Sequence, residues 1–203
     1  FSFLDLSFCE PVFINWVKPV ARETLEQYAK RLRNQIPEGN PVVVGISLGG
    51  MLVTEMAKAD KDIKGIILAS NKTAAEFPGY WRIGKWLPLY KWFPAGLLKK
   101  FMLLNQWILG AHQKDQEQLL RQVIRESDMD FVKWAIEAIL YWNNKEVPPN
   151  LVHIHGNADK LLPVKRVKAD YTIDGGTHVM TLDHAGEVSV LLKKLILDRN
   201  NAV

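Results

Sequence analysis

Three short apolar runs, each bounded by turn-forming residues, constrain the fold of this chain most strongly. They occupy residues 42–44, 66–68 and 151–154. Each run has Gly or Pro close to at least one of its ends. Runs of this length that are rich in β-branched residues are typical of strands buried on both faces of a parallel sheet. Residues 12–14 and 171–173 are weaker strand candidates.

Helical patterns lie between these runs. Apolar or aromatic residues recur with a period near 3.6 over residues 25–36, where Thr24 can cap the helix together with Gln27. Residues 48–58 and 188–196 give two further helical patterns. Strands that alternate with helices through short connections predict a doubly wound α/β layer with a mostly parallel sheet.

Residues 71–145 interrupt this alternation. They contain no convincing strand but two helical patterns, over residues 95–109 and 116–141, and the second is broken near Ser127. We therefore predict a helical insertion between two strands of the sheet.

Composition is consistent with one globular core, residues 1–70 and 146–203, that carries the insertion 71–145. The 203 residues are 48% hydrophobic, enough to bury a sizeable core. A single cysteine, Cys9, excludes an internal disulfide and a thiolate metal cluster. The sequence contains no apolar run of about 18 residues that is free of charge, so it predicts no transmembrane helix. The net charge of +4 is too small to indicate nucleic-acid binding by itself.

The segment GISLGG, residues 45–50, lies directly between a predicted strand and a predicted helix. A serine hydroxyl is a weak nucleophile and needs both an adjacent base and a fixed, exposed position. A tight strand-to-helix turn gives Ser47 that position, and we expect a Cβ at Gly45 or Gly49 to collide with neighbouring backbone. The helix N-terminus, including the Leu48 N–H, can then stabilise an oxyanion. Glycine-flanked serines also occur in ordinary turns.

Two further polar residues follow predicted strands. Asp159 lies in HGNADKLLP after the run at 151–154, where a carboxylate can accept the Nδ1–H of a histidine. His178 lies in GGTH after the candidate strand at 171–173, on a glycine-rich loop that could reach a serine. Taken singly, Asp159 also fits a turn or capping residue, and His178 a surface residue.

Together, Ser47, Asp159 and His178 follow the chain order of the α/β-hydrolase triad. The chain resembles the α/β-hydrolase superfamily from about residue 12 to residue 197, on the segments VVVGISLGGM, HIHGNADKLLP and GGTHVM, with a helical insertion where that family carries its cap. The resemblance implies Ser47 as nucleophile, Asp159 as orienting acid and His178 as base, without a metal or an organic cofactor.

Two features depart from the family's pattern. Ile46 precedes the serine where many relatives have His or an aromatic residue, so we expect an aliphatic pocket wall there. The family takes its second oxyanion donor from an early loop, commonly marked by His-Gly or Gly-Gly, and no glycine precedes Gly39. We therefore expect the N-terminal strands of the sheet, with that turn, to precede Phe1.

Two histidines on the third apolar run are candidates for another kind of site. His153 and His155 are two residues apart on a predicted strand, share a face and could bind a metal. No cysteine or paired carboxylate accompanies them. We therefore interpret His153 as a core residue and His155 as part of the turn that supports Asp159.

Other residues compete for the roles of base and acid. His184 is a rival base, although the neighbouring Asp183 is expected to cap the last helix. Asp174 is a rival acid, but it is too close to His178 in sequence to reach it easily. His112 has no supporting neighbours.

The insertion concentrates basic and aromatic residues. From Glu76 to Leu109 it carries five basic residues and one acidic residue, which accounts for the whole positive excess, and six of the seven Trp lie in 71–145. Helices at a membrane interface combine Trp and Lys in this way. A cap would instead turn its apolar face, including Trp81 and Trp86, toward the cleft and keep its lysines solvated. We favour the cap, which would line an apolar or acyl-binding pocket.

The predicted function is a serine hydrolase that cleaves a carboxylic ester through an acyl-enzyme intermediate. Cleavage of a thioester, an amide or a carbon–carbon bond would use the same residues. The alternative is a catalytically silent hydrolase-fold protein that binds a partner, suggested by the absent early loop and the Trp-rich insertion. We expect a small-molecule ester or acyl substrate, no nucleic-acid partner and, by default, a cytoplasmic location.

Overall fold

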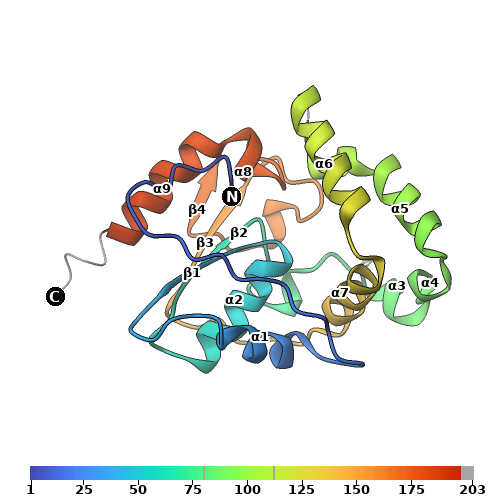
Figure 1. Cartoon of the computed structure of the whole chain (residues 1–203), viewed down its shortest axis with the longest axis horizontal. Helices are drawn as coiled ribbons and strands as arrows, with labels where there is room; N and C mark the ends of the chain where they lie inside the picture. The colour runs from blue at the N-terminus through green and yellow to red at the C-terminus, as the bar shows by residue number, and fades with distance from the viewer. Residues whose placement is uncertain (80, 112, 198–203) are drawn as a thin grey trace.

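A four-stranded parallel sheet forms the centre of the molecule (Figure 1). The computed structural model describes residues 1–79, 81–111 and 113–197. The strands lie in the sheet in chain order: β1 (Val42–Ile46), β2 (Lys64–Leu68), β3 (Leu151–Gly156) and β4 (Tyr171–Ile173). The parallel sheet and the weak strand candidate at 171–173 are thereby confirmed.

The pairing register brings the carboxyl ends of the strands to one edge. Ile46 lies opposite Leu68 across β1 and β2, and Leu68 lies opposite Ile154 across β2 and β3. The loops that follow β1, β3 and β4 therefore emerge at the same edge of the sheet, which is where open α/β sheets hold their functional groups.

The other weak strand candidate, residues 12–14, was wrong. This segment is irregular, and Val12 and Phe13 are 62% and 64% exposed. An apolar run forms a stable strand only when a neighbouring strand pairs with it and one of its faces is buried. Among the described residues no strand pairs with this segment, although the half-buried Ile14 packs against the cluster of α1 and α2.

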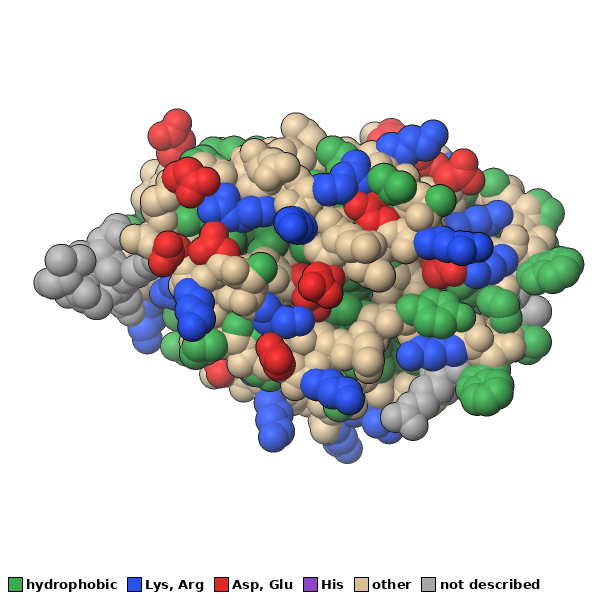
Figure 2. Space-filling model, turned by 90° about the horizontal axis from the view of Figure 1, so that it is seen from below, with side chains coloured by type: hydrophobic (Ala, Val, Ile, Leu, Met, Phe, Trp, Pro, Cys, Tyr) green, Lys and Arg blue, Asp and Glu red, His purple; other side chains and the backbone are tan. Residues whose placement is uncertain are grey.

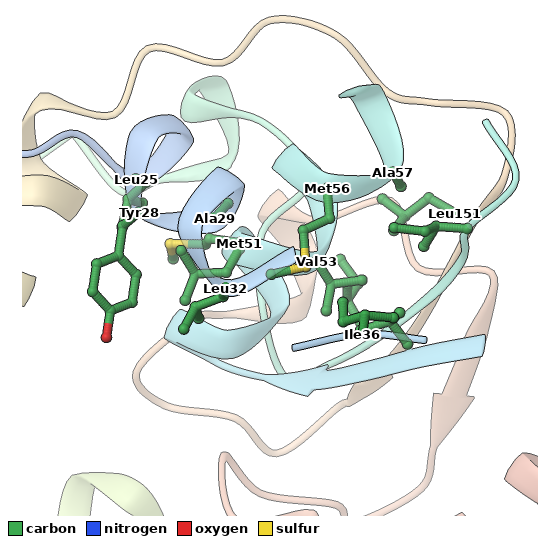
Figure 3. Packing of buried hydrophobic residues seen from close by; sticks show 14 of the residues in the cluster. Leu25, Tyr28, Ala29, Leu32, Ile36, Met51, Val53, Met56, Ala57 and Leu151 are labelled. Carbon is green, nitrogen blue, oxygen red and sulfur yellow. The ribbon is translucent and has the colours of Figure 1, made fainter. Parts of the chain in front are cut away.

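Helices cover both faces of the sheet, which explains why its strands are apolar on both sides. Helices α1 (Leu25–Arg33) and α2 (Leu48–Ala59) pack on one face, and α9 (Ala185–Leu197) packs on the other (Figure 1). Side chains alternate along each strand, so Ile67 enters the first cluster and Ile66 the second. Figure 3 shows the first cluster between α1, α2 and the sheet.

The helix α1 begins as its sequence predicts. The Thr24 side chain accepts a hydrogen bond from the Gln27 N–H, and the Gln27 side chain accepts one from the Thr24 N–H. This reciprocal pair satisfies two of the donors that a helix N-terminus leaves free. Near the start of the chain, Leu4 is buried against the α9 face and the Asp5 N–H donates to Ser189.

The chain between β2 and β3 is helical, as predicted, with no strand among its described residues. Its elements are η1 (Ala74–Glu76), α3 (Trp81–Trp86), α4 (Leu89–Trp92), α5 (Ala95–Leu104), η2 (Gln106–Leu109), α6 (Lys114–Glu126) and α7 (Met129–Tyr141). The predicted break near Ser127 is confirmed, because Asp128 caps α7 by accepting from two backbone N–H groups. Within the described ranges, no helix is long and apolar enough to cross a bilayer.

The helix expected over residues 95–109 is shorter than predicted. It ends at Leu104, and the chain continues as the 3₁₀ turn η2. The Asn105 side chain donates to the Phe101 carbonyl at 2.8 Å, the same carbonyl that accepts from the Asn105 N–H at 3.1 Å, so this side chain competes with the backbone at the last turn of the helix.

Helix α7 attaches this segment to the core. Ala138 and Trp142 belong to the cluster under α1 and α2. The Trp134 indole donates to the Glu23 carbonyl at 2.9 Å, and the Trp142 indole donates to the Glu55 carboxylate at 2.6 Å. Figure 1 shows α3 to α6 grouped away from the sheet, beyond α7.

Candidate active site

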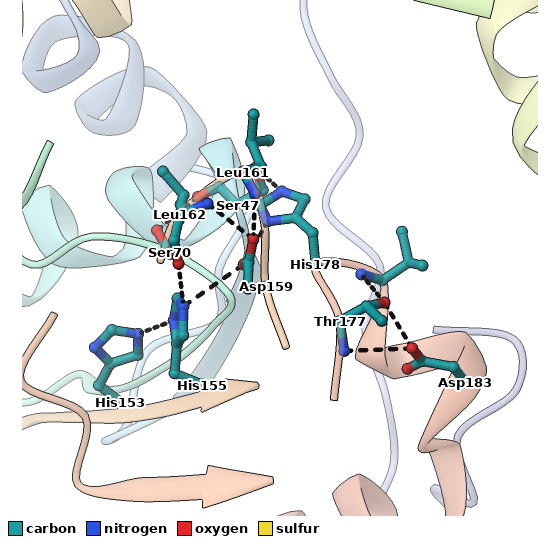
Figure 4. Close-up of polar contacts among 11 residues, drawn as sticks. Ser47, Ser70, His153, His155, Asp159, Leu161, Leu162, Thr177, His178 and Asp183 are labelled. Atoms are coloured by element: carbon teal, nitrogen blue, oxygen red, sulfur yellow. Dashed lines mark hydrogen bonds and ion pairs between the residues drawn. The ribbon is translucent and has the colours of Figure 1, made fainter. Parts of the chain in front are cut away.

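The three residues predicted for catalysis meet at the carboxyl edge of the sheet. Ser47 follows β1, Asp159 follows β3 and His178 follows β4 (Figure 4). His178 Nε2 lies 3.0 Å from the Ser47 hydroxyl, and His178 Nδ1 lies 2.8 Å from Asp159 Oδ2. These two distances make one continuous chain of hydrogen bonds from the serine to the carboxylate.

The carboxylate determines which nitrogen of the histidine carries the proton. An ionised carboxylate only accepts, so His178 Nδ1 must donate to Asp159. The neutral imidazole then has a free lone pair on Nε2, which accepts from the Ser47 O–H. Both side chains, of Asp159 and His178, are buried. A serine, a base and a group that orients the base are thus arranged for nucleophilic chemistry.

Ser47 is held in a conformation that non-glycine residues rarely adopt. Its φ is +52° and its ψ is −119°. Its N–H donates to the Leu68 carbonyl at 3.0 Å, and its carbonyl accepts from the Ser70 hydroxyl at 2.7 Å. Strain of this kind persists only where the surroundings fix the backbone, and it clusters at functional sites. No sequence pattern singled out Ser70.

The glycines around Ser47 differ from each other in what they permit. A Cβ on Gly45 would lie 2.3 Å from the Gly49 carbonyl oxygen, so the predicted collision is confirmed there. The prediction was wrong for Gly49, where a Cβ would meet nothing within 4 Å because this second residue of α2 faces open space. Gly50 is the other constrained position, since its Cβ would lie 2.5 Å from Ser70.

Leu48 and Ile46 are the chain neighbours of Ser47. Leu48 is the first residue of α2, so its N–H is among those that have no acceptor within the helix. Ile46 is half-buried and packs against the α9-side cluster. The helix N-terminus therefore offers at least one backbone donor beside the Ser47 hydroxyl.

Asp159 is fixed by backbone donors as well as by His178. Its Oδ1 accepts from the Leu161 and Leu162 N–H groups, each at 2.8 Å. Its Oδ2 accepts from His178. These bonds leave the carboxylate little freedom to rotate away from the imidazole.

His155 supports this turn, as predicted. Its Nε2 lies 2.8 Å from the Leu162 carbonyl, which can only accept, so Nε2 carries a proton. The same nitrogen lies 3.5 Å from Asp159 Oδ2. His155 Nδ1 must then accept from His153 Nε2 at 3.1 Å, which leaves His153 Nδ1 as a buried acceptor without a partner (Figure 4).

Both histidines are neutral because they are buried. Burial lowers the pKa of His155, and it lowers the pKa of His153 to about 3. His153 is wholly inaccessible, in agreement with its interpretation as a core residue. Among the residues that the structure describes, no three His, Cys, Asp or Glu side chains are grouped to hold a metal ion.

The loop that carries His178 is fixed by Asp183. The Thr177 hydroxyl donates to Asp183 Oδ2 at 2.6 Å, and the Thr177 N–H donates to the same oxygen at 3.3 Å. The prediction that Asp183 caps the last helix was wrong. Asp183 lies inside the short helix α8 (Met180–Asp183), and its carboxylate turns back toward Thr177 instead of toward the start of α9.

The rival candidates lie outside the hydrogen-bonded chain. His184 lies beside Asp183, and the exposed Asp174 accepts from the Asn157 side chain at 2.7 Å. Cys9 is a free thiol near the N-terminus, hydrogen-bonded to the Leu6 carbonyl. His112 lies outside the described residues.

The helical segment reaches the site through residues 107–111. The Lys160 ammonium, beside Asp159 in the chain, lies 5.6 Å from the centre of the Trp107 ring. A Cβ on Gly110 would lie 2.3 Å from Thr177 Cβ. Ala111 packs with Val179 in a small apolar cluster. This segment therefore borders the loops of both Asp159 and His178.

The two tryptophans predicted to line the pocket have different surroundings. Trp81 packs against Phe77, with 4.9 Å between ring centres, and Trp86 is 87% exposed. Phe77 in turn contacts Trp142 of the core, so Phe77 connects the Trp81 ring to the residues that attach α7 to the core. Composition indicated that the segment is aromatic, but only the packing of α7 decides which aromatic ring faces which loop.

A cleft of about 760 Å³ lies away from these three residues. It is bordered by α1, α2 and α7, and its walls include Glu23, Glu55, Trp134 and Trp142. Ser47, Asp159 and His178 do not line it.

Several solved structures share this architecture. An esterase from Thermogutta terrifontis superposes with a TM-score of 0.62 at 13% identity, over 87% of this chain and 73% of that one. A hydrolase from Pseudomonas aeruginosa gives 0.62 at 13%, over 86% and 73%. A lipase-esterase related protein from Clostridium acetobutylicum gives 0.60 at 16%, over 87% and 77%. At these identities the likeness establishes the fold alone.

Sequence comparison gives the family. No curated protein matches the chain significantly. The profile of the alpha/beta hydrolase family, however, matches residues 11–190, which include β1 to β4 and all three residues of the hydrogen-bonded chain. The protein therefore belongs to the alpha/beta hydrolase family.

Proposed function

We propose that this protein is a serine hydrolase that cleaves carboxylic esters. The hydrogen-bonded chain from Ser47 through His178 to Asp159 carries the proposal. Family membership supports hydrolysis in general, and esterases among the similar folds favour an ester as the bond that is cleaved. The reaction needs no metal or organic cofactor, because the nucleophile and the base are both side chains of this chain.

The proposed reaction begins at the Ser47 hydroxyl. Its oxygen attacks the ester carbonyl while His178 Nε2 takes the proton, and Asp159 stabilises the resulting imidazolium. The Leu48 N–H is a donor for the oxyanion. His178 then returns the proton to the leaving alcohol. A water molecule, activated by the same nitrogen, hydrolyses the acyl-enzyme and frees Ser47.

The substrate proposed is a small or medium ester with an apolar acyl group. Ile46 beside the serine is aliphatic, and Trp107 and Ala111 border the loops of Asp159 and His178. Thioesters, amides and carbon–carbon bonds remain alternative targets, since the same side chains would attack them. We propose a small-molecule ester or acyl substrate and no nucleic-acid partner. The proposed location is the cytoplasm.

An ester panel tests the proposal. p-Nitrophenyl esters of increasing acyl length should be hydrolysed by the wild-type protein, and Ser47→Ala and His178→Ala should each lower kcat/KM by about 10⁴-fold or more. His184→Ala is the matched control and should retain the wild-type rate. Circular dichroism should be unchanged in all three variants. If the wild type hydrolyses no ester, the proposal that it cleaves esters is overturned.

A further inference from the structure

Among the side chains that the structure describes, seven large apolar ones of α3, α4, α5 and their junctions are exposed to solvent. Trp86 and Trp92 are 87% and 83% exposed. The set, named the α3–α5 surface here, is Trp86, Leu87, Trp92, Phe93, Leu97, Phe101 and Leu104. Single exposed apolar residues are ordinary, but a contiguous group of them marks an interaction surface.

The spacing along α5 makes one exposed stripe. Leu97, Phe101 and Leu104 are separated by four and three residues, so they lie on the same side of the helix. Leu98 is buried on the inner side. A helix that only covered a core would carry polar residues on its outer side. Instead, the solvent side of α5 carries three large apolar side chains together with Lys100.

The segment that carries this surface contributes only positive charge. Residues 77–114 contain no acidic residue, and Lys85, Lys91 and Lys100 are exposed beside the apolar set. Lys91 also pairs with Glu137 of α7 at 2.5 Å. Figure 2 shows hydrophobic and basic side chains gathered at the end of the molecule where Figure 1 places α3, α4 and α5.

This combination favours a lipid bilayer over a second copy of the chain. Two copies that met through this surface would bring like charges together, which opposes association. An anionic bilayer offers the opposite charge to the lysines and an apolar interior to the leucines and Phe101. Tryptophan side chains prefer the boundary between these two regions. We propose that the α3–α5 surface binds an anionic membrane surface, with Trp86 and Trp92 inserted among the headgroups.

The binding does not depend on the hydrolase proposed above. A protein with an inactive Ser47 would still present the same surface, so the Ser47→Ala variant should bind vesicles as the wild type does. Vesicle binding by Ser47→Ala therefore tests the membrane proposal separately from the proposed chemistry.

Vesicle co-sedimentation tests the inference. Wild-type protein should sediment with vesicles of phosphatidylcholine and phosphatidylglycerol and bind phosphatidylcholine alone much more weakly, and added salt should weaken the binding. Trp86→Ser with Trp92→Ser should lower the partition coefficient by about tenfold or more. The matched control is Phe13→Ser with Val190→Ser, which removes side chains that are 64% and 71% exposed elsewhere on the molecule. That control should bind as the wild type does.

A charge variant separates electrostatic from apolar binding. Lys85→Gln with Lys100→Gln should remove most of the preference for the anionic vesicles. The inference is overturned if the wild type sediments with neither vesicle, or if the Phe13 and Val190 variant loses as much binding as the tryptophan variant. It is equally overturned if the wild type forms a dimer in light scattering that the tryptophan variant abolishes, since a second copy would then cover the surface.

Discussion

The hydrogen bonds of single side chains explain how a loop serine and a loop histidine are held 3.0 Å apart. Each of the three residues has a second set of partners that fixes it: Ser70 and Leu68 for Ser47, two backbone N–H groups for Asp159, and Asp183 for the loop of His178. In the proposed hydrolase, the site is ordered before the substrate binds, so little of the substrate's binding energy would be needed to order it.

His153 makes stability depend on pH. Its pKa is about 3 in the folded protein because of burial, against an ordinary value of 6.5. Between these two values the unfolded chain binds a proton that the folded chain does not, so the free energy of unfolding falls as the pH falls from 6.5 toward 3. The slope contributed by one such group is at most about 1.4 kcal/mol per pH unit, and His155 acts in the same direction.

Replacement of His153 should therefore flatten the acid side of the stability curve. In His153→Gln the amide can still donate to His155, but it does not titrate. Urea unfolding at a series of pH values should show a smaller loss of stability on acidification than in the wild type. An unchanged slope in His153→Gln would contradict the assignment of His153 as a buried neutral group.

At the residue scale, chain order and motif identified Ser47, Asp159 and His178, because glycine-bounded turns after strands leave few positions for reactive groups. Ser70 and the contact of Gly110 with Thr177 were not predictable. Both depend on which loops meet in space, and neither residue carries a local pattern. Trp86 was misassigned to the pocket wall for the same reason, because it is 87% exposed.

The junction of β1 and α2 is the element on which the serine's geometry depends. Here the chain turns so sharply that a Cβ at Gly45 would overlap the Gly49 carbonyl at 2.3 Å, whereas a Cβ at Gly49 would enter open space. The two glycines of one motif therefore offer a matched pair of substitutions.

Gly45→Ala should destabilise the protein by about 1–3 kcal/mol or more, because backbone must move to admit the methyl group. Gly49→Ala should instead stabilise it by about 0.5–1 kcal/mol, since alanine favours the helix and restricts the unfolded chain. Urea denaturation measures both changes. Equal destabilisation by the two substitutions would mean that the turn is packed differently from the geometry described above.

Elements were predictable where periodicity was long or boundaries were marked. The strands β1 to β3, the capped helix α1 and the break between α6 and α7 follow from such signals. Short helices such as α3 and α4 could not be predicted in this way, because one or two helical turns show no clear period and depend on tertiary contacts. The apolar run at 12–14 failed as a strand because pairing is a property of the neighbourhood and not of the run.

For the molecule as a whole, the helical segment and the sheet share one core. The side chains of Ala138 and Trp142 pack among residues of α1 and α2, and the Trp134 indole reaches the Glu23 carbonyl. A segment anchored in this way cannot unfold without exposing part of the core.

Unfolding should therefore be a single transition. Six of the seven tryptophans lie in residues 71–145, so their fluorescence reports on the helical segment, whereas far-ultraviolet circular dichroism reports on all helices. The urea midpoints from the two signals should coincide. A fluorescence midpoint clearly below the dichroism midpoint would show that the segment unfolds as a separate unit.

Covalent labelling with a fluorophosphonate examines the reactive serine itself, without any assumption about the natural substrate. The reagent should modify the protein once, and peptide mass spectrometry should locate the phosphonyl group on Ser47. Labelling should disappear in Ser47→Ala and become much slower in His178→Ala, because the hydroxyl loses its base. Absence of labelling in the folded wild-type protein, or labelling that persists in Ser47→Ala, would contradict a nucleophilic role for Ser47.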